Sequence, residues 1–73
     1  MSASTAIKQR LDDLNMTQVE LAEAIGSTRQ NLSNKLARDN FTAKELSKIC
    51  AVLKLSLVLK SADNKEYNIE YLD

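Results

Sequence analysis

The chain has 73 residues, of which ten are basic and ten acidic, and its formal net charge is zero. A chain of this length forms one domain with one modest core, and its 44% content of apolar residues favours a folded domain over disorder. It has no histidine, no proline, one glycine and one cysteine, which argues against zinc sites, disulfide frameworks, Ser–His–Asp triads and glycine-rich phosphate loops. We therefore expect no metal site and no cofactor.

The sequence also bears on where the protein works. No run of residues approaches the ~18 apolar residues of a membrane span. The first five residues lack the basic segment and apolar core of a signal peptide. A single cysteine, Cys50, fits a reducing compartment. We expect a cytoplasmic protein with no membrane partner.

The first half of the chain predicts two helices. Residues 4–14 carry apolar side chains at helical spacing on one face, and Asn15 is expected to end this helix. Thr17 and Glu20 have the spacing of a capping box, so a second helix is expected to begin at this threonine. Gly26, the only glycine, lies where that helix should end in a left-handed turn, after residue 24 or 25.

Two further helices are expected before residue 55. The third begins at Ser27 or Thr28 and is polar except for a thin apolar stripe. That stripe consists of Leu32 and Leu36. The fourth helix repeats the start signal of the second, because Thr42 and Glu45 again have the spacing of a capping box. Its core-facing residues are expected to be Leu46, Ile49, Cys50 and Leu53.

After residue 55 the periodicity changes from helical to alternating. The turn-forming residues 62–65 separate two alternating segments, so a β-hairpin is expected. One face of this hairpin is apolar and consists of Leu57, Leu59, Tyr67, Ile69 and Tyr71. An isolated hairpin is marginal in water, so we expect this face to pack on the helices, to pair with another chain, or to do both. The predicted fold is mainly α, with a helical core at residues 4–55 and the hairpin at residues 56–72.

The arrangement at residues 17–36 is typical of a DNA-binding helix-turn-helix, because a short capped helix and a tight turn precede a helix with a polar surface. The string from Met16 to Lys35 resembles the Xre/Cro-type helix-turn-helix of phage repressors and their bacterial relatives. The matching positions are Thr17-Gln18, Leu21-Ala22, Gly26, Thr28 and Leu32-Ser33. Residues 41–49 resemble the next helix of that family, and the resemblance covers residues 4–55.

The resemblance implies a four-helix, lambda-repressor-like domain that binds DNA. It departs from the family at Lys35, where relatives usually carry a bulky apolar residue. The C-terminal hairpin is closer to short Cro-like and antitoxin-like members, which use β-structure to dimerise. We therefore expect the apolar face of the hairpin to bind a second copy of the chain or a partner protein.

The resemblance also implies which residues contact DNA. The base-reading residues of the recognition helix, residues 28–36, are expected to be Thr28, Arg29, Gln30, Ser33 and Asn34. Their chemistry agrees, since arginine suits guanine, and glutamine or asparagine suits adenine. Gln18 resembles the family residue that bonds a backbone phosphate. Further candidates for phosphate contacts are Asn31, Lys35, Arg38 and Lys44.

The overall neutrality of the chain conceals a local excess of positive charge. Residues 29–60 carry seven basic and two acidic side chains, whereas residues 1–28 and 61–73 are both net acidic. The basic excess begins at the expected recognition helix, and local charge at the contact surface governs DNA binding. We expect weak non-specific affinity and a strong dependence on base contacts.

Three classes of function are open to such a chain. The first is a sequence-specific regulator of transcription, a repressor that binds a palindromic operator in double-stranded DNA as a homodimer. The alternative is an antitoxin-like module that binds a toxin partner and represses its own operon secondarily. An enzyme is not expected, because the sequence has no pairing of a nucleophile with a base. Polar residues on a single helix usually form a solvated face, and only their place in the motif favours DNA contact.

Overall fold

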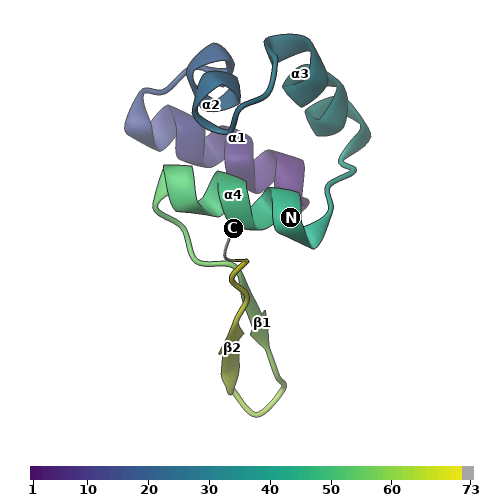
Figure 1. Cartoon of the computed structure of the whole chain (residues 1–73). Coiled ribbons are helices and arrows are strands. Elements are labelled where there is room, and N and C mark those ends of the chain that lie inside the picture. Colours follow the sequence, from purple (N-terminus) through teal and green to yellow (C-terminus); the bar gives the residue numbers. More distant parts are fainter. Residues whose placement is uncertain (72–73) are drawn as a thin grey trace.

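The structure, a computed structural model, describes residues 1–71 and consists of four helices followed by a hairpin (Figure 1). The elements are α1 (Ala3–Leu14), α2 (Gln18–Ala24), α3 (Arg29–Arg38), α4 (Ala43–Leu53), β1 (Val58–Lys60) and β2 (Glu66–Asn68). The predicted class, mainly α with a C-terminal hairpin, is confirmed. The end of the predicted hairpin range, residue 72, lies outside the described residues. Within residues 1–71, no helix is both long and apolar enough to cross a membrane.

Two helices begin with the capping boxes that the sequence predicts. At the start of α2, Oγ1 of Thr17 accepts the N–H of Glu20 at 3.1 Å, and Oε1 of this glutamate accepts the threonine N–H at 3.0 Å. Thr42 and Glu45 repeat this pair of bonds at the start of α4, with the same distances. Each box satisfies two backbone donors that a helix otherwise leaves unpaired.

The other helix ends also follow local chemistry. Thr28, rather than Ser27, caps α3, because its Oγ1 accepts the N–H of Asn31 at 3.1 Å. Helix α1 starts at Ala3, one residue before the predicted start, since the side chain of Ser2 caps it. At the other end of α1, Asn15 adopts the left-handed conformation at φ 53°, so its predicted role as the helix end is confirmed.

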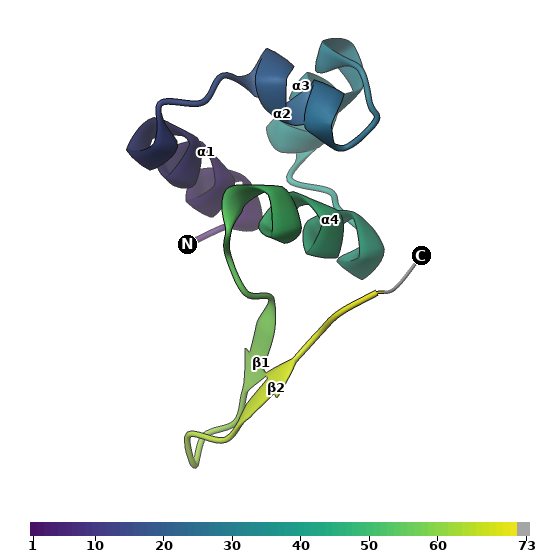
Figure 2. The same ribbon diagram turned by 60° about the vertical axis from the view of Figure 1, so that its left-hand side comes forward.

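The core lies where the four helices meet, and α2 and α3 lie together on one side of α1 and α4 (Figures 1 and 2). Its buried apolar residues are Ile7, Leu11, Leu21, Ala22, Leu32, Leu36, Ile49 and Leu53. The predicted thin stripe of α3 is confirmed, since Leu32 and Leu36 are its buried residues. Because these two side chains are held by the other helices, the remaining surface of α3 is free to face outward.

Two hydrogen bonds between distant residues fix the helices relative to each other. Nε of Arg10 in α1 donates to the carbonyl of Leu53 at 2.9 Å, which satisfies a free carbonyl at the end of α4. Oδ1 of Asp39, in the loop after α3, accepts the N–H of Ser4 at 2.8 Å. This hydrogen bond from the backbone of Ser4 holds the pKa of the Asp39 carboxyl below its ordinary value.

The hairpin projects away from the helices (Figures 1 and 2). Its strands are antiparallel, and Leu59 lies opposite Tyr67 in the register. The loop is closed by hydrogen bonds from the N–H of Ser61 to the carbonyl of Lys65 and from the N–H of Asn64 to the carbonyl of Ser61. Asn64 has φ 67°, the left-handed conformation that completes a short hairpin loop. The predicted turn therefore lies where the alternation of the sequence breaks.

Candidate nucleic-acid interface

Helix α3 buries only Leu32 and Leu36, and its polar side chains cover the rest of its surface. At 100° per residue, Gln30 and Asn34 lie opposite the buried pair Leu32 and Leu36. The expected base-reading residues of this helix are all exposed: Arg29, Gln30, Ser33 and Asn34. Thr28 is exposed as well, and its hydroxyl oxygen is already used to cap the helix. All five residues are thus accessible to solvent.

The turn between α2 and α3 sets the direction of the recognition helix. Gly26 has φ 72°, which glycine adopts without strain. The next residue, Ser27, donates its N–H to the carbonyl of Ala22 at 2.8 Å and so closes the end of α2. Ala22 is 1% exposed, and a small residue at this point lets the two helices approach closely.

A hydrogen bond links two of the exposed side chains of α3. Nε2 of Gln30 donates to Oδ1 of Asn34 at 3.2 Å, between residues one helical turn apart. The pair orients both amides on the outermost line of the helix. The four-residue spacing of Gln30 and Asn34 in the sequence indicates only that they share a face of the helix. It does not indicate that their side chains bond to each other.

A polar groove of about 210 Å³ runs along one flank of α3. It is lined by Asn31, Asn34, Lys35, Arg38 and Asn40. Three of the predicted phosphate contacts are therefore side by side. Asn40 also lines the groove, from the loop between α3 and α4, and the local sequence pattern does not predict this position.

Lys35 forms an ion pair that the sequence did not predict. Its Nζ lies 2.7 Å from Oε2 of Glu45 on α4, and both side chains are partly exposed. The hydrogen bond from Lys35, followed by that from the backbone of Thr42, holds the pKa of Glu45 below its ordinary value. Because an apolar side chain at this position would pack on α4, the ion pair replaces that contact with an electrostatic one.

The remaining predicted phosphate contacts lie apart from this groove. Gln18 is the first residue of α2, is half-buried and lines a different hollow together with Lys8 and Met16. Lys44 is exposed on the first turn of α4, next to the Glu45 that pairs with α3. The structure thus divides the predicted cationic and amide contacts among the starts of α2 and α4 and the flank of α3.

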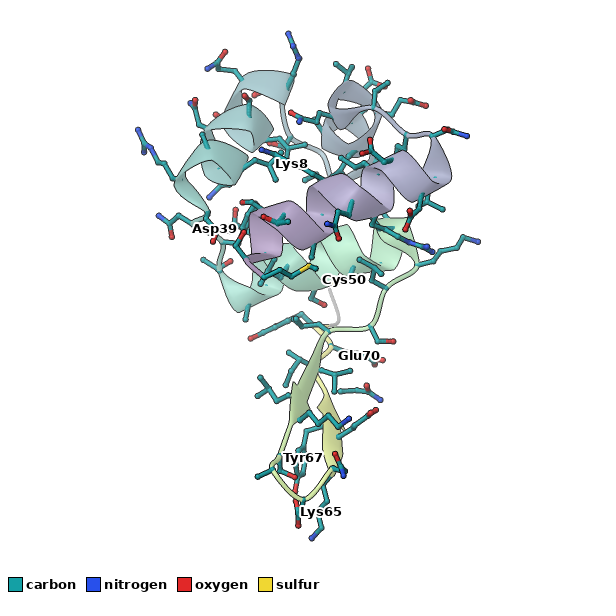
Figure 3. The ribbon with its side chains drawn as sticks, turned by 180° about the vertical axis from the view of Figure 1, so that it is seen from behind. Lys8, Asp39, Cys50, Lys65, Tyr67 and Glu70 are labelled. Atoms are coloured by element: carbon teal, nitrogen blue, oxygen red, sulfur yellow. The ribbon has the colours of Figure 1, made fainter. Side chains whose placement is uncertain are left out.

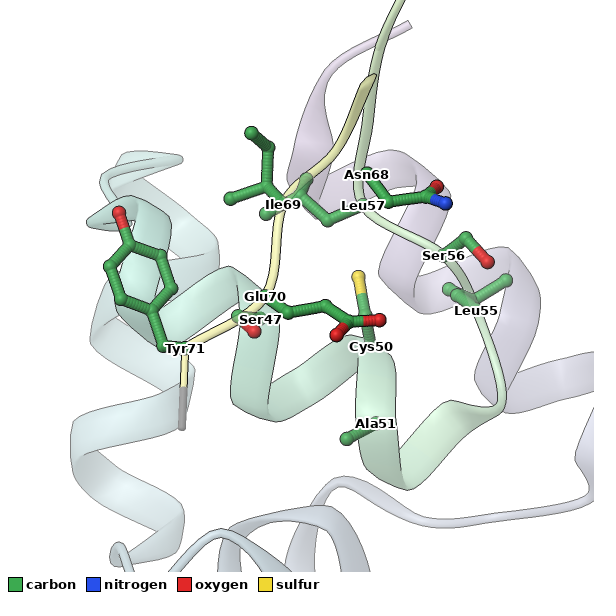
Figure 4. A pocket seen from close by; sticks show the side chains of 10 residues that line it. All are labelled: Ser47, Cys50, Ala51, Leu55, Ser56, Leu57, Asn68, Ile69, Glu70 and Tyr71. Atoms are coloured by element: carbon green, nitrogen blue, oxygen red, sulfur yellow. The ribbon is translucent and has the colours of Figure 1, made fainter. Parts of the chain in front are cut away.

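The predicted apolar face of the hairpin is divided into two parts. Leu57 and Ile69 are half-buried and line a groove of about 300 Å³ against α4, which also holds Cys50 and the exposed Tyr71 (Figure 4). Leu59 and Tyr67 are 62% and 56% exposed. In Figure 3, Tyr67 lies well away from the helices, near the end of the hairpin.

The thiol of Cys50 lies in this groove rather than deep in the core (Figure 4). Partial burial raises the pKa of the thiol above its ordinary value, so it stays protonated at neutral pH. Among residues 1–71, no group of three His, Cys, Asp or Glu side chains has an arrangement that would hold a metal ion.

A comparison with known families agrees with this geometry. The sequence profile of the family described as "Helix-turn-helix" matches residues 7–60, which is well over half of the chain. The chain belongs to the Xre/Cro-type helix-turn-helix family. It is therefore a DNA-binding regulator of the Xre type. The comparisons found no curated protein and no solved structure that matches the chain.

Proposed function

We propose that this Xre-type regulator is a repressor that reads a specific operator with Arg29, Gln30, Ser33 and Asn34. The observation that carries the proposal is the exposed polar surface of α3, opposite its two buried leucines. The N-terminal part of a recognition helix reaches base edges in the major groove, where arginine and amide side chains discriminate bases. A dimer seated on the operator represses by excluding polymerase.

The phosphate contacts assist this reading by fixing the register of the protein on DNA. The groove beside α3 offers the guanidinium of Arg38 and the amides of Asn31 and Asn40 to one backbone segment. Gln18 and Lys44, at the starts of α2 and α4, supply two further contacts. Lys35 contributes less charge to this surface because Glu45 already pairs with it.

Binding to DNA duplexes tests the proposed specificity. Affinity is measured for a duplex selected from a random pool and for an unrelated duplex, each at two salt concentrations. We expect the selected duplex to bind at least 10³-fold more tightly, as specific binding proteins do. Equal affinity for both duplexes would refute sequence-specific reading.

The proposal includes a homodimer formed through the hairpin. Leu59 and Tyr67 lie opposite each other and are exposed, and an apolar pair in this position is shielded from water when a second hairpin covers it. Two-fold symmetry would place two recognition helices about 34 Å apart, so the operator would be palindromic. Sedimentation of the full chain should show a dimer at micromolar concentration.

A matched pair of variants tests the hairpin interface. The double change Leu59→Asn and Tyr67→Asn removes apolar surface on the proposed interface, whereas Lys60→Ala changes the opposite face of the same strand. We expect the first variant to be monomeric and the second to remain dimeric. A dimer that survives the double change would show that the chains pair elsewhere.

The second candidate function is an antitoxin-like module whose hairpin binds a toxin. The observation that favours it is the same projecting hairpin (Figure 2). Its short strands offer unpaired edges beside the exposed Leu59 and Tyr67. Under this alternative the chain sediments as a monomer by itself. It would also form a complex with the product of a neighbouring gene, and the Leu59 and Tyr67 changes would abolish that complex. Retention of the complex by those variants would exclude the hairpin as the toxin-binding element.

A further inference from the structure

A small cavity lies between the recognition helix and the helix that follows it. Its volume is about 140 Å³, and its lining comes from the end of α2, from α3, from the loop before α4 and from α4 itself. We propose that this cavity binds a small apolar carboxylate, such as an aromatic acid or a branched short-chain fatty acid, and that the bound ligand weakens DNA binding. The site does not depend on the proposed function, whereas its effect on DNA binding rests on it.

Most of the cavity wall is apolar. Leu32 of α3 and Ile49 of α4 form its buried part, since each is 1% exposed. Ile25 and Phe41 also line it and are half-buried, so a ligand can enter from solvent without unfolding the domain. An apolar cavity of about 150 Å³, lined by leucine, isoleucine and phenylalanine, is large enough to bind benzene. This cavity therefore has room for one aromatic ring or a branched chain of about five carbons.

The polar part of the lining leaves one cation free for a ligand. Both carboxylate oxygens of Glu45 are engaged, because Oε1 accepts the N–H of Thr42 and Oε2 pairs with Nζ of Lys35. Lys48, the other charged residue of the lining, belongs to neither of the two ion pairs among residues 1–71. Its ammonium group can pair with a carboxylate, and the hydroxyl of Ser27 can donate a second hydrogen bond. The lining therefore suits a ligand with an apolar body and one negative charge.

Lys35 connects the cavity to the surface proposed to contact DNA. Its side chain lines both the cavity and the polar groove beside α3. A carboxylate bound in so small a cavity lies within the Debye length of about 10 Å from this lysine, so its charge lowers the attraction of the groove for phosphates. Such coupling is reciprocal, and bound DNA must weaken the binding of the carboxylate by the same factor.

Titration of the full chain with benzoate, in the absence of DNA, tests the site. Phe41 is the only phenylalanine in the chain, so isotope labelling of phenylalanine gives a single ring to observe by NMR. We expect saturable binding with a dissociation constant of about 1 mM, as suits so small a ligand, and nuclear Overhauser contacts between benzoate and this ring. Benzyl alcohol, which lacks the charge, should bind about tenfold more weakly. Acetate, which lacks the ring, should show no saturable binding.

Two variants separate the charge of the cavity from its volume. Lys48→Gln should weaken benzoate binding about tenfold and leave the binding of benzyl alcohol unchanged. Lys60→Gln, a matched change of an exposed lysine on the hairpin, should alter neither. Lys35→Leu places an apolar side chain on the cavity wall, where it can fill the space, so the binding of both compounds should weaken about tenfold. Urea unfolding checks that each variant is folded.

The effect on DNA is measured with the selected duplex at constant ionic strength. Saturating benzoate should weaken the binding of this duplex about fivefold, and the same concentration should have less effect on Lys48→Gln. An unchanged affinity for the duplex in the presence of bound benzoate would overturn the coupling.

Two other results would overturn the site itself. They are the absence of saturable benzoate binding, and binding without any contact to the ring of Phe41. Neither would affect the proposed reading of an operator. Conversely, if the chain selects no duplex, the proposed function fails, while the benzoate titration without DNA still decides whether the cavity is a binding site.

Discussion

At the scale of single residues, the ion pair of Lys35 separates two cations that look alike in the sequence. Lys35 and Arg38 line the same groove beside α3, yet only Lys35 has a carboxylate partner among the described residues, at 2.7 Å. A cation that is already paired releases fewer counterions when it meets a phosphate, because its charge is partly neutralised. The two residues should therefore differ in their contribution to DNA binding.

This difference predicts two salt dependences. The logarithm of affinity falls with the logarithm of salt concentration by about 0.9 for each phosphate contact on B-DNA. We expect Arg38→Ala to reduce this slope by about 0.9 and Lys35→Ala to reduce it by clearly less, in titrations of one selected duplex. Glu45→Gln, which releases Lys35, should increase the slope. Equal reductions by the arginine and lysine changes would contradict this assignment.

Gly26 carries a second prediction at the residue scale, and it concerns stability. Its φ of 72° is left-handed, and a Cβ built there would meet no atom of the described residues within 4 Å. The cost of Gly26→Ala is therefore backbone strain alone, about 1–2 kcal/mol. Gly26→Asn should cost less, since asparagine tolerates this conformation. Urea unfolding measures both free energies, and equal costs would show that strain is not the cause.

At the scale of elements, Arg10 connects the first helix to the end of the last. Its Nε donates to the carbonyl of Leu53 at 2.9 Å, and its positive charge lies at the negative end of the α4 dipole. We expect Arg10→Ala to lower the free energy of unfolding by about 1–2 kcal/mol. Lys8→Ala, a change of an exposed cation on the same helix, is the control. Equal losses would mean that general charge, rather than this contact, stabilises the pair of helices.

The elements also show which kinds of information the sequence carries. Both capping boxes and the left-handed turns at Asn15 and Gly26 depend on residues that are close in the chain, so their chemistry is visible in the sequence. The contacts from Arg10 to Leu53 and from Ser4 to Asp39 join residues 43 and 35 positions apart. Such contacts depend on how the helices pack, which local patterns do not specify.

The features of the candidate site also divide into those that local sequence patterns predict and those that depend on packing. The exposed row of α3 follows from its apolar stripe and its cap, and was predicted. The pairing of Lys35 with Glu45, the bond between Gln30 and Asn34, and the place of Asn40 beside the groove were not predicted. Each requires a side-chain orientation or a loop path, and several rotamers of a long polar side chain fit the same sequence pattern.

At the scale of the whole molecule, charge and shape follow the same axis. Helix α3 and the hairpin lie at opposite ends of a chain whose longest extent is 38 Å (Figure 1). The basic residues of α3 are Arg29, Lys35 and Arg38, whereas residues 61–71, at the hairpin end, carry three acidic side chains against one basic one. A neutral molecule can therefore turn one basic end toward DNA while its acidic end stays away from the phosphates.

The stability of the whole domain should depend on pH only in acid. The carboxyl pKa values of Glu20, Asp39 and Glu45 all lie below their ordinary values, for Glu20 and Asp39 chiefly because a backbone N–H donates to each carboxylate. A depressed pKa stabilises the fold above the pKa of the unfolded chain, about 4, and this stabilisation is lost as pH falls through the lower folded values. The chain has no histidine, so we expect a nearly constant free energy of unfolding between pH 5 and 8 and a decline below about pH 4.

Asp39→Asn tests the contribution that joins the loop after α3 to the start of α1. The amide can still accept the N–H of Ser4, but it cannot ionise, so the variant should be less stable than the unchanged protein at pH 7, and this difference should shrink as the pH falls towards 2. Urea unfolding from pH 2 to 8 measures the difference. Gln9→Ala, which removes no charge from the exposed face of α1, should give a curve parallel to that of the unchanged protein. A contribution from the charge of Asp39 must vanish when its carboxyl is protonated. If the free energies of unfolding of Asp39→Asn and the unchanged protein instead differ by the same amount at every pH, the contact stabilises the fold through geometry and not through charge.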